Sequence, residues 1–331
     1  MKLRDLKVAV TGAEGFIGSH LVERLIQEGA NVRALVQYNS FNSFGWLEEI
    51  STSDSLEVVM GDVRDAGFCN SFLEGVDACF HLAALIAIPY SYNAPQSYID
   101  VNVHGTNNIC KSALQNNLKL LIHTSTSEVY GTAIYVPIDE NHALQPQSPY
   151  SASKIGADSI AASYSHSFDL PLLIIRPFNT YGPRQSNRAV IPTIISQLLK
   201  NGGQINLGDL SPTRDFNYIE DTIDGFIKAF NNCEAILGET INLGSGHEVS
   251  IDNLVKLIAN IIDIEVQVAS EQSRLRPKDS EVFRLLADIS KARKYLDYKP
   301  NHSLEDGLIK TIEWFSNKDN LSRYKADHYV I

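Results

Sequence analysis

The sequence of 331 residues predicts an α/β fold, in which a parallel sheet is wound with helices on both faces and is followed by a smaller C-terminal α/β lid. Its length is enough to bury a large core. In the first half, continuous apolar runs of strand length alternate with stretches of helical spacing, as in parallel sheets covered on both faces. Beyond about residue 177 the alternation becomes irregular. We therefore expect a first domain at 1–177 and a substrate-binding domain at 178–331, from which some elements return to the first.

The strands expected in the first domain are short apolar runs bounded by turn signals. They lie at 6–11, 32–36, 56–60, 78–82, 119–124 and 172–176. The expected helices repeat apolar residues every three or four positions. They lie at 17–28, 100–115, 150–168, 190–199, 251–262 and 304–315. Two further short strands, at 204–207 and 240–243, are expected in the lid.

The composition is that of an ordinary globular protein, with 44% hydrophobic and 20% charged residues. The 39 acidic residues exceed the 28 basic ones, and the formal net charge of −11 argues against a nucleic-acid partner. No apolar run approaches the roughly 20 residues that span a bilayer, so no membrane partner is expected. The four cysteines show no paired spacing, and we expect buried, reduced thiols and a cytoplasmic protein.

A glycine-rich turn follows the first strand and opens the first helix, where Gly12, Gly15 and Gly18 form the pattern GxxGxxG. A tight turn and a close approach of the backbone to a pyrophosphate both favour residues without a Cβ. The helix N-terminus supplies free N–H groups and a partial positive charge for the phosphates. Because the strand and the helix stand in the required places, the loop predicts a bound dinucleotide.

This loop, within TGAEGFIGSH, resembles that of the extended short-chain dehydrogenase/reductase family. The resemblance extends from residue 7 to about residue 314 and implies a Rossmann-type sheet that binds NAD. Later motifs match in order, namely MGDVRD, FHLAA, NVHGT with Asn102, and RPFNTYGPR. By itself, Asn102 is equally well explained as a helix cap or a surface amide. The residues that the resemblance assigns to the cofactor are Gly12, Gly15, Phe16, Ile17, Gly18, Asp62, Val63, Leu82, Ala83, Ala84, Tyr150, Lys154 and Pro177.

One position departs from the family's pattern. The NAD-binding members carry an acidic residue at the end of the second strand, where it bonds the ribose hydroxyls. Here the stretch reads VRALVQYNS, with Val36 at that position and Arg33 in the wrong phase of the strand. The stretch holds neither a carboxylate to repel a 2′-phosphate nor an arginine pair to attract one. The missing positive charge favours NAD, and NADP stays open.

Tyr150 and Lys154 lie four residues apart in YSASK, at the start of the helix at 150–168, so they share a helix face. A nearby ammonium and a nicotinamide cation stabilise a phenolate and are expected to lower the pKa of Tyr150 from about 10 toward neutrality. Tyr150 is then a base that takes a hydroxyl proton while hydride leaves the same carbon. Such a pair is common by chance, but behind the glycine loop it predicts a dehydrogenase step.

The fifth strand runs into TSTSEVYG, in which Thr126, Ser127 and Glu128 resemble the catalytic triplet of nucleotide-sugar 4,6-dehydratases, in the serine variant of the GDP-mannose enzymes. The resemblance implies that oxidation at C4 acidifies the C5 proton, which Glu128 removes. The C6 hydroxyl then leaves as water, hydride returns to C6, and a proton returns to C5. Thr126 would bond the C4 oxygen. Ser127 is a poor acid, so Glu128 or a water is expected to protonate the leaving hydroxyl.

The same resemblance implies a nucleoside-diphosphate sugar as substrate and no metal. Asn179 resembles the side chain that bonds a sugar-nucleotide phosphate, and Arg214 and Arg276 resemble the arginines that hold the diphosphate and nucleoside. Arg188 is a weaker candidate for the same pocket. Arginine suits this role because its guanidinium can donate two bonds to one phosphate. A GDP- or UDP-linked N-acetylglucosamine is the expected substrate.

Members of this family pair through the two helices that carry Asn102 and Tyr150, so a homodimer or homotetramer is expected. The apolar face expected to make this contact comprises Ala152, Ile155, Ala157, Ile160 and Ala161.

Three functions stay open on the sequence: a nucleotide-sugar 4,6-dehydratase, a nucleotide-sugar 4-epimerase, and a cofactor-binding protein without catalysis. Tyr150, Lys154 and Glu128 argue against the third, because a binding module needs none of them. If Glu128 is only a polar residue at the end of a strand, the epimerase becomes the better explanation.

Overall fold

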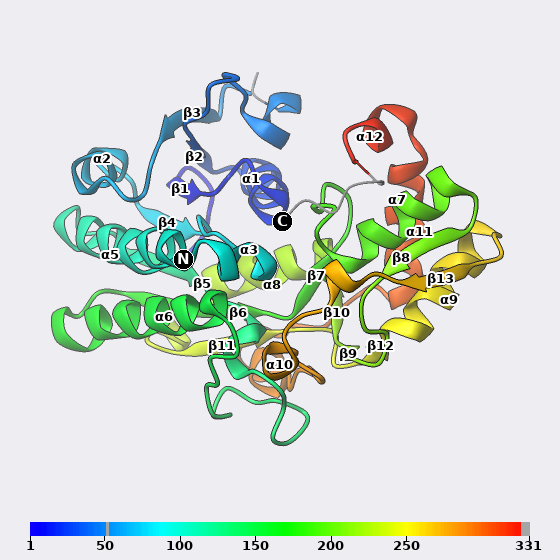
Figure 1. Ribbon diagram of the computed structural model, residues 1–331. Helices are drawn as coiled ribbons and strands as arrows, with labels where there is room; N and C mark the ends of the chain where they lie inside the picture. Colours follow the sequence, from blue (N-terminus) through cyan, green and yellow to red (C-terminus); the bar gives the residue numbers. More distant parts are fainter. Residues whose placement is uncertain (51–52, 326–331) are drawn as a thin grey trace.

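Seven parallel strands form the central sheet, in the order β11-β6-β5-β4-β1-β2-β3 (Figure 1). The computed structural model describes residues 1–50 and 53–325. The strands are β1 (Lys7–Thr11), β2 (Asn31–Gln37), β3 (Leu56–Gly61), β4 (Ala78–His81), β5 (Leu120–Thr124), β6 (Leu172–Pro177) and β11 (Thr240–Leu243). All neighbouring pairs run parallel. The doubly wound sheet predicted from the sequence is confirmed.

Different helices cover the two faces of this sheet. They are α1 (Phe16–Gln27), α2 (Ala66–Phe72), α5 (Gly105–Gln115), α6 (Pro149–Phe168) and α8 (Ile219–Asn231). Val8 and Val10 belong to a core shared with α1 and α8, whereas Ala9 belongs to a core shared with α2, α5 and α6. Successive side chains of a strand point to opposite faces. The sheet is therefore buried on both sides, with α5 and α6 side by side along one of them (Figure 1).

One strand of the sheet comes from beyond residue 177. The assignment of 240–243 to the lid is wrong, because β11 is an edge strand paired with β6, with Thr240 opposite Ile174. Helix α8 also packs on the sheet, where the rings of Phe226 and Phe230 meet Phe80 of β4. A short apolar strand carries no local signal of which sheet it joins. The division of the chain at residue 177 stays a prediction.

The remainder of the second half contains short sheets and further helices, most of which lie on the right in Figure 1. Its strands pair as β7 (Asn179–Tyr181) with β10 (Phe216–Tyr218), β8 (Gln204–Leu207) with β13 (Gln267–Ser270), and β9 (Thr213–Arg214) with β12 (Val249–Ser250). Its helices are α7 (Val190–Asn201), α9 (Ile251–Ile262), α10 (Ser290–Leu296), α11 (Leu304–Ser316) and α12 (Lys318–Ser322). The strand predicted at 204–207 and the three predicted helices are therefore present.

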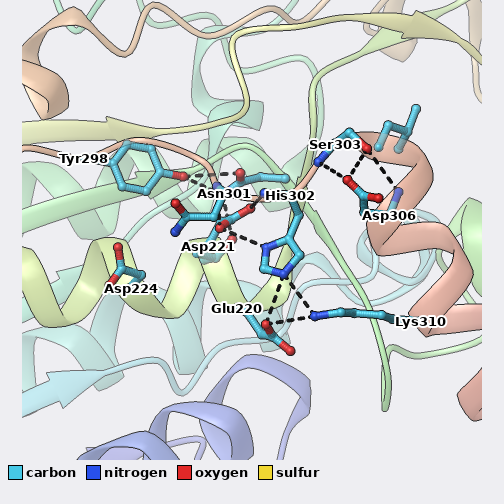
Figure 2. Close-up of polar contacts among 12 residues, drawn as sticks. Glu220, Asp221, Asp224, Tyr298, Asn301, His302, Ser303, Asp306 and Lys310 are labelled. Atoms are coloured by element: carbon cyan, nitrogen blue, oxygen red, sulfur yellow. Dashed lines mark hydrogen bonds and ion pairs between the residues drawn. The ribbon is translucent and has the colours of Figure 1, made fainter.

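Figure 2 shows how the segment before α11 is fastened to α8. The buried Asp221 carboxylate accepts hydrogen bonds from the backbone N–H groups of Asn301 (2.9 Å) and His302 (3.1 Å). The His302 ring contacts Asp221 through Nδ1 (3.1 Å) and Glu220 through Nε2 (3.2 Å). Lys310 of α11 also reaches Glu220, at 3.3 Å. This network links α8, which covers the central sheet, to helix α11; its members are Glu220, Asp221, Asn301, His302 and Lys310.

The helix predicted at 100–115 has two parts. Its first turn is the π-helical segment η2 (Ile99–His104), which continues as α5. It follows the short helices α3 (Ile88–Asn93) and α4 (Pro95–Tyr98). Single π-helical turns often lie at functional sites. The shorter 3₁₀ segments are η1 (Gly45–Glu49), η3 (Ser127–Tyr130), η4 (Cys233–Ala235), η5 (Gln272–Arg274) and η6 (Lys278–Ser280).

All four cysteines are free and buried, as predicted. In the part of the chain that the structure describes, no helix has both the length and the apolar character needed to cross a membrane.

Candidate active site

The carboxyl ends of β1 and β4 meet at the point where the strand order reverses. The Thr11 hydroxyl accepts hydrogen bonds from the backbone N–H groups of Leu82 (3.1 Å) and Ala83 (3.0 Å). The glycine loop after β1 and the turn at Leu82, Ala83 and Ala84 therefore lie against each other. In open parallel sheets, ligands bind in the crevice at this reversal.

Two glycines of the loop after β1, Gly12 and Gly18, leave no room for a side chain. Gly12 has a φ of +67°, and a Cβ on it would lie 2.8 Å from the Ala83 nitrogen. A Cβ on Gly18 would lie 2.2 Å from the Gly12 oxygen. Gly15 immediately precedes α1, whose first residues are Phe16 and Ile17. The N–H groups of a first helical turn have no intrahelical partners, so this cradle fits a pyrophosphate.

The residues predicted to flank the adenine lie after β3. The Asp62 carboxylate pairs with the Arg64 guanidinium, and this hydrogen bond holds the pKa of Asp62 below its ordinary value. Val63 is buried, and its carbonyl accepts a hydrogen bond from the Asn108 side chain at 3.0 Å. Sequence reasoning did not identify Arg64 as the partner of Asp62. The adenine assignment stays a prediction.

Asn102 is neither a cap nor a surface amide, because its side chain is buried. Its Oδ1 accepts from the Leu85 backbone N–H at 2.8 Å, and its Nδ2 donates to the Leu85 carbonyl at 2.9 Å. Nδ2 also lies 2.9 Å from the Ser153 hydroxyl of α6. Asn102 thereby ties the turn after β4 to the helix that carries Tyr150.

Helix α6 holds Tyr150 and Lys154 in fixed positions. Ser148 caps the helix in a reciprocal bond with Ser151, and Pro149 is the first helical residue, so the helix starts one residue before the predicted position. Tyr150 and Lys154 are both buried, one turn apart. The Lys154 ammonium donates to the Thr124 carbonyl at the end of β5, at 2.7 Å.

Two opposing effects act on the pKa of Tyr150. Burial raises the pKa of the Tyr150 phenol above its ordinary value, while a hydrogen bond from Thr126 acts in the opposite direction. Burial also lowers the pKa of Lys154 to about 8. Desolvation thus opposes the fall toward neutrality that was expected beside a nicotinamide cation, and that fall stays a prediction.

A buried ionic cluster lies one helical turn beyond Lys154. The Asp158 carboxylate accepts hydrogen bonds from the Arg176 guanidinium (3.0 Å) and the Ser125 hydroxyl (2.7 Å), and it contacts His123 Nε2 at 3.1 Å. Its hydrogen bond with His123 and the nearby cations hold the pKa of Asp158 below its ordinary value against the effect of burial. Sequence reasoning missed this cluster, although the four-residue spacing from Lys154 places Asp158 on the same helix face.

Thr126, Ser127 and Glu128 lie where β5 ends and η3 begins. The Thr126 hydroxyl accepts a hydrogen bond from the Glu128 backbone N–H at 3.2 Å, and Ser127 is buried. The half-buried Glu128 side chain makes no hydrogen bond with any described residue. Its charge acts on both Tyr150 and Arg214. The Glu128 carboxylate therefore lies within electrostatic reach of the phenol and of the predicted substrate arginine.

A cleft of about 280 Å³ gathers the predicted substrate residues. Its lining includes Asn179, Arg188, Arg214 and Arg276. Tyr150 and Glu128 do not line this cleft, but the charge of Glu128 acts on the lining residue Arg214. Sequence reasoning did not identify two further lining residues, Arg274 and Glu281. Glu281 pairs with Arg214 at 3.3 Å and lies 3.6 Å from Arg276.

The predicted pairing face of α6 is only partly available to a partner subunit. Ala157 and Ala161 are fully buried within the chain, whereas Ala152 is exposed and Ile155 and Ile160 are half-buried. These five residues therefore do not form one exposed apolar face, because the inner side of α6 packs on the sheet. The homodimer or homotetramer stays a prediction.

The model of the GDP-mannose 4,6 dehydratase family matches residues 9–311 of this chain. The chain belongs to this family. This family assignment agrees with the predicted extended short-chain dehydrogenase/reductase membership. Among the relatives, the UDP-glucose 4-epimerase of Mycolicibacterium smegmatis is 33% identical over 95% of this chain and 99% of its own length. The human dTDP-D-glucose 4,6-dehydratase is 29% identical over 96% of this chain and 92% of its own.

Solved structures of both kinds share the fold. A dTDP-glucose 4,6-dehydratase of Streptomyces venezuelae, with NAD and TYD bound, superposes with a TM-score of 0.88 at 29% identity and covers 97% of this chain and 99% of its own. A UDP-glucuronic acid 4-epimerase of Bacillus cereus, in complex with UDP-glucuronic acid and NAD, superposes with a TM-score of 0.87 at 29% identity. The match covers 94% of this chain and 99% of the epimerase chain. The family is thus an NAD-dependent one that contains both dehydratases and epimerases.

Proposed function

We propose that this family member is a nucleotide-sugar 4,6-dehydratase, which converts a nucleoside-diphosphate hexose to the 4-keto-6-deoxy sugar. The environment of the Glu128 carboxylate is the main support for this proposal. This carboxylate makes no hydrogen bond with any described residue, and its charge acts on Tyr150. A 4-epimerase needs only the removal and return of hydride at C4, whereas an elimination needs a base for the C5 proton.

The proposed reaction assigns one task to each side chain. Tyr150 takes the proton of the C4 hydroxyl, with the buried Lys154 ammonium favouring the phenolate. Thr126 bonds the C4 oxygen, and Glu128 removes the C5 proton that the C4 ketone acidifies. The C6 hydroxyl leaves as water, protonated by Glu128 or by a water, with Ser127 the weaker candidate. A proton returned to C5 by Glu128 completes the reaction, and NAD, when bound, would supply the acceptor for the C4 hydride and the donor of the hydride to C6.

The cofactor is proposed to lie in the crevice between β1 and β4. The fit of Gly12 and Gly18 to a closely approaching ligand supports this site. The proposed contacts are Gly12, Gly15, Phe16, Ile17, Gly18, Asp62, Val63, Leu82, Ala83, Ala84, Tyr150, Lys154 and Pro177. NAD is the proposed dinucleotide, as in the solved relatives.

The substrate is proposed to bind its diphosphate in the cleft lined by Asn179, Arg188, Arg214 and Arg276. Several arginines around one cleft match the charge of a diphosphate. GDP- and UDP-N-acetylglucosamine are the first sugar nucleotides to test. We further propose a cytoplasmic homodimer or homotetramer.

Replacing Glu128 tests the proposal. In Glu128→Gln, cofactor reduction by the sugar nucleotide should persist, because oxidation at C4 uses Tyr150. Water elimination should fall about 10²- to 10⁴-fold, the usual contribution of a general base. Absorbance of the reduced nicotinamide follows the first step, and mass spectrometry of the sugar nucleotide follows the second. The control is Glu74→Gln, which removes the same charge from an exposed position.

The second candidate is a nucleotide-sugar 4-epimerase. Two relatives named as UDP-glucose 4-epimerases favour this function. The protein of Mycolicibacterium smegmatis is 33% identical to this chain, and that of Methanocaldococcus jannaschii is 32% identical. An epimerase should keep its turnover in Glu128→Gln and should form an isomer of unchanged mass. That result would replace the dehydratase with the epimerase. A binding protein without catalysis would show neither activity before substitution.

A further inference from the structure

The end of β2 has a carboxylate, but it comes from another element. Val36, at the position of the family's acidic residue, is fully buried. Glu14 lies in the glycine loop after β1, and its Oε1 accepts a hydrogen bond from the backbone N–H of Gln37 at 2.9 Å. Gln37 is the last residue of β2. The Glu14 side chain therefore crosses from the glycine loop to the end of the neighbouring strand.

The second carboxylate oxygen of Glu14 is unbonded. Oε2 is buried and has no hydrogen-bond partner in the described part of the chain. Burial raises the pKa of the Glu14 carboxyl, and the backbone bond from Gln37 acts in the opposite direction. A buried acceptor without a donor destabilises a protein, so its presence calls for a functional or structural explanation. A further hydrogen-bond donor would satisfy Oε2 and favour the charged carboxylate.

The segment that follows β2 also contacts Glu14, through its backbone and its Cβ. The Trp46 backbone N–H donates to the Glu14 carbonyl at 3.2 Å. Gly45, with a φ of +58°, packs so closely that a Cβ on it would lie 3.0 Å from the Glu14 Cβ. Two segments thus fix Glu14 before any ligand binds, and fixed groups recognise ligands with less loss of entropy.

We propose that Glu14 selects NAD over NADP. Its carboxylate takes the place of the acidic residue that NAD-binding members carry on β2, accepts a hydrogen bond from the adenosine ribose, and repels a 2′-phosphate. In this class of fold the ribose hydroxyls lie at the end of the second strand, where the carboxylate of Glu14 is bonded to Gln37. This role of Glu14 rests on the proposed cofactor site. It would account for a valine, Val36, at the position where other NAD-binding members carry an acidic residue.

The test is dinucleotide binding to the full chain, measured by isothermal titration calorimetry without sugar nucleotide. Glu14→Gln keeps a side-chain oxygen for the Gln37 N–H and removes the charge. The ratio of the NADP Kd to the NAD Kd should fall at least about tenfold, because NAD loses a charge-assisted bond and NADP loses a repulsion. Glu28→Gln removes the same charge from the exposed residue just after α1 and should leave the ratio unchanged.

A second variant separates the charge from the packing of the loop. Glu14→Asp keeps the charge on a shorter side chain and should retain the preference for NAD. An unchanged ratio in Glu14→Gln, or equal losses of preference in the Gln and Asp variants, would overturn the inference. If the unaltered chain binds both dinucleotides equally, the inference alone fails. If it binds neither, the proposed cofactor site fails, and the inference fails with it.

Discussion

Lys154 is the residue whose surroundings set the pH range of the proposed oxidation. Burial lowers its pKa to about 8, and the charge of Asp158 acts in the opposite direction. Because this pKa lies below the ordinary value for lysine, the ammonium is present below about pH 8 and is lost as the pH rises through that value. We predict that cofactor reduction slows above about pH 8, measured by stopped-flow absorbance with the sugar nucleotide.

Lys154→Arg is the matched variant for this prediction. Arginine stays protonated throughout the accessible pH range, so the decline near pH 8 should disappear even if the overall rate is lower. The same decline in the arginine variant would show that another group titrates. Tyr150→Phe should lower cofactor reduction about 10²- to 10⁴-fold at every pH.

Residues that form a motif could be predicted at this scale, and residues joined only by folding could not. Tyr150 and Lys154 could be predicted from the sequence, because helical periodicity and their distance from the glycine loop are enough to identify the pair. The pairing of Asp158 with Arg176 requires that α6 pack on β6, which spacing alone does not reveal. The raised pKa of Tyr150 likewise depends on how completely the helix is buried.

At the scale of elements, the network in Figure 2 links helix α11 to α8. Asp221 is 1% exposed and accepts the backbone N–H groups of Asn301 and His302. Asp221→Ala would leave these donors without their partner. We predict a loss of about 2–4 kcal/mol in the free energy of unfolding, measured by urea denaturation.

Asp224→Ala is the control on the same helix. Asp224 is more exposed than Asp221 and pairs with Lys228 at 3.0 Å, four residues along α8. Its removal should cost under about 1 kcal/mol. Equal losses in the two variants would mean that the Asp221 network contributes no more than a surface ion pair.

Most elements could be predicted because apolar periodicity is a local property, as it is for β1, α1 and α6. The pairing partners of the strands could not be predicted from the sequence. The segment Thr240–Leu243 was expected to be a strand of the lid, but it pairs with β6 in the central sheet. The π-helical turn at Ile99–His104 also gave no signal, because it keeps nearly the same spacing of apolar residues as the α-helix that follows.

At the scale of the whole molecule, the proposed site is assembled from both halves of the chain. The first half supplies the glycine loop, Glu128 and Tyr150, and the second half supplies the arginine cleft. Segment 278–281 joins them, since the Ser280 hydroxyl lies 2.6 Å from the Tyr92 hydroxyl and donates to the Gln147 carbonyl. This assembly agrees with a reaction in which a diphosphate is held by one half while its sugar reaches the other.

The central claim, that this assembly eliminates water, can be tested on the product. The chain should be incubated with NAD and a panel of sugar nucleotides in deuterium oxide, and the products should be examined by mass spectrometry and NMR. The account predicts a product that has lost one water and carries deuterium at C5, because Glu128 exchanges the C5 proton with solvent. A product of unchanged sugar composition with C4 inverted, or a dehydrated product without deuterium at C5, would contradict it.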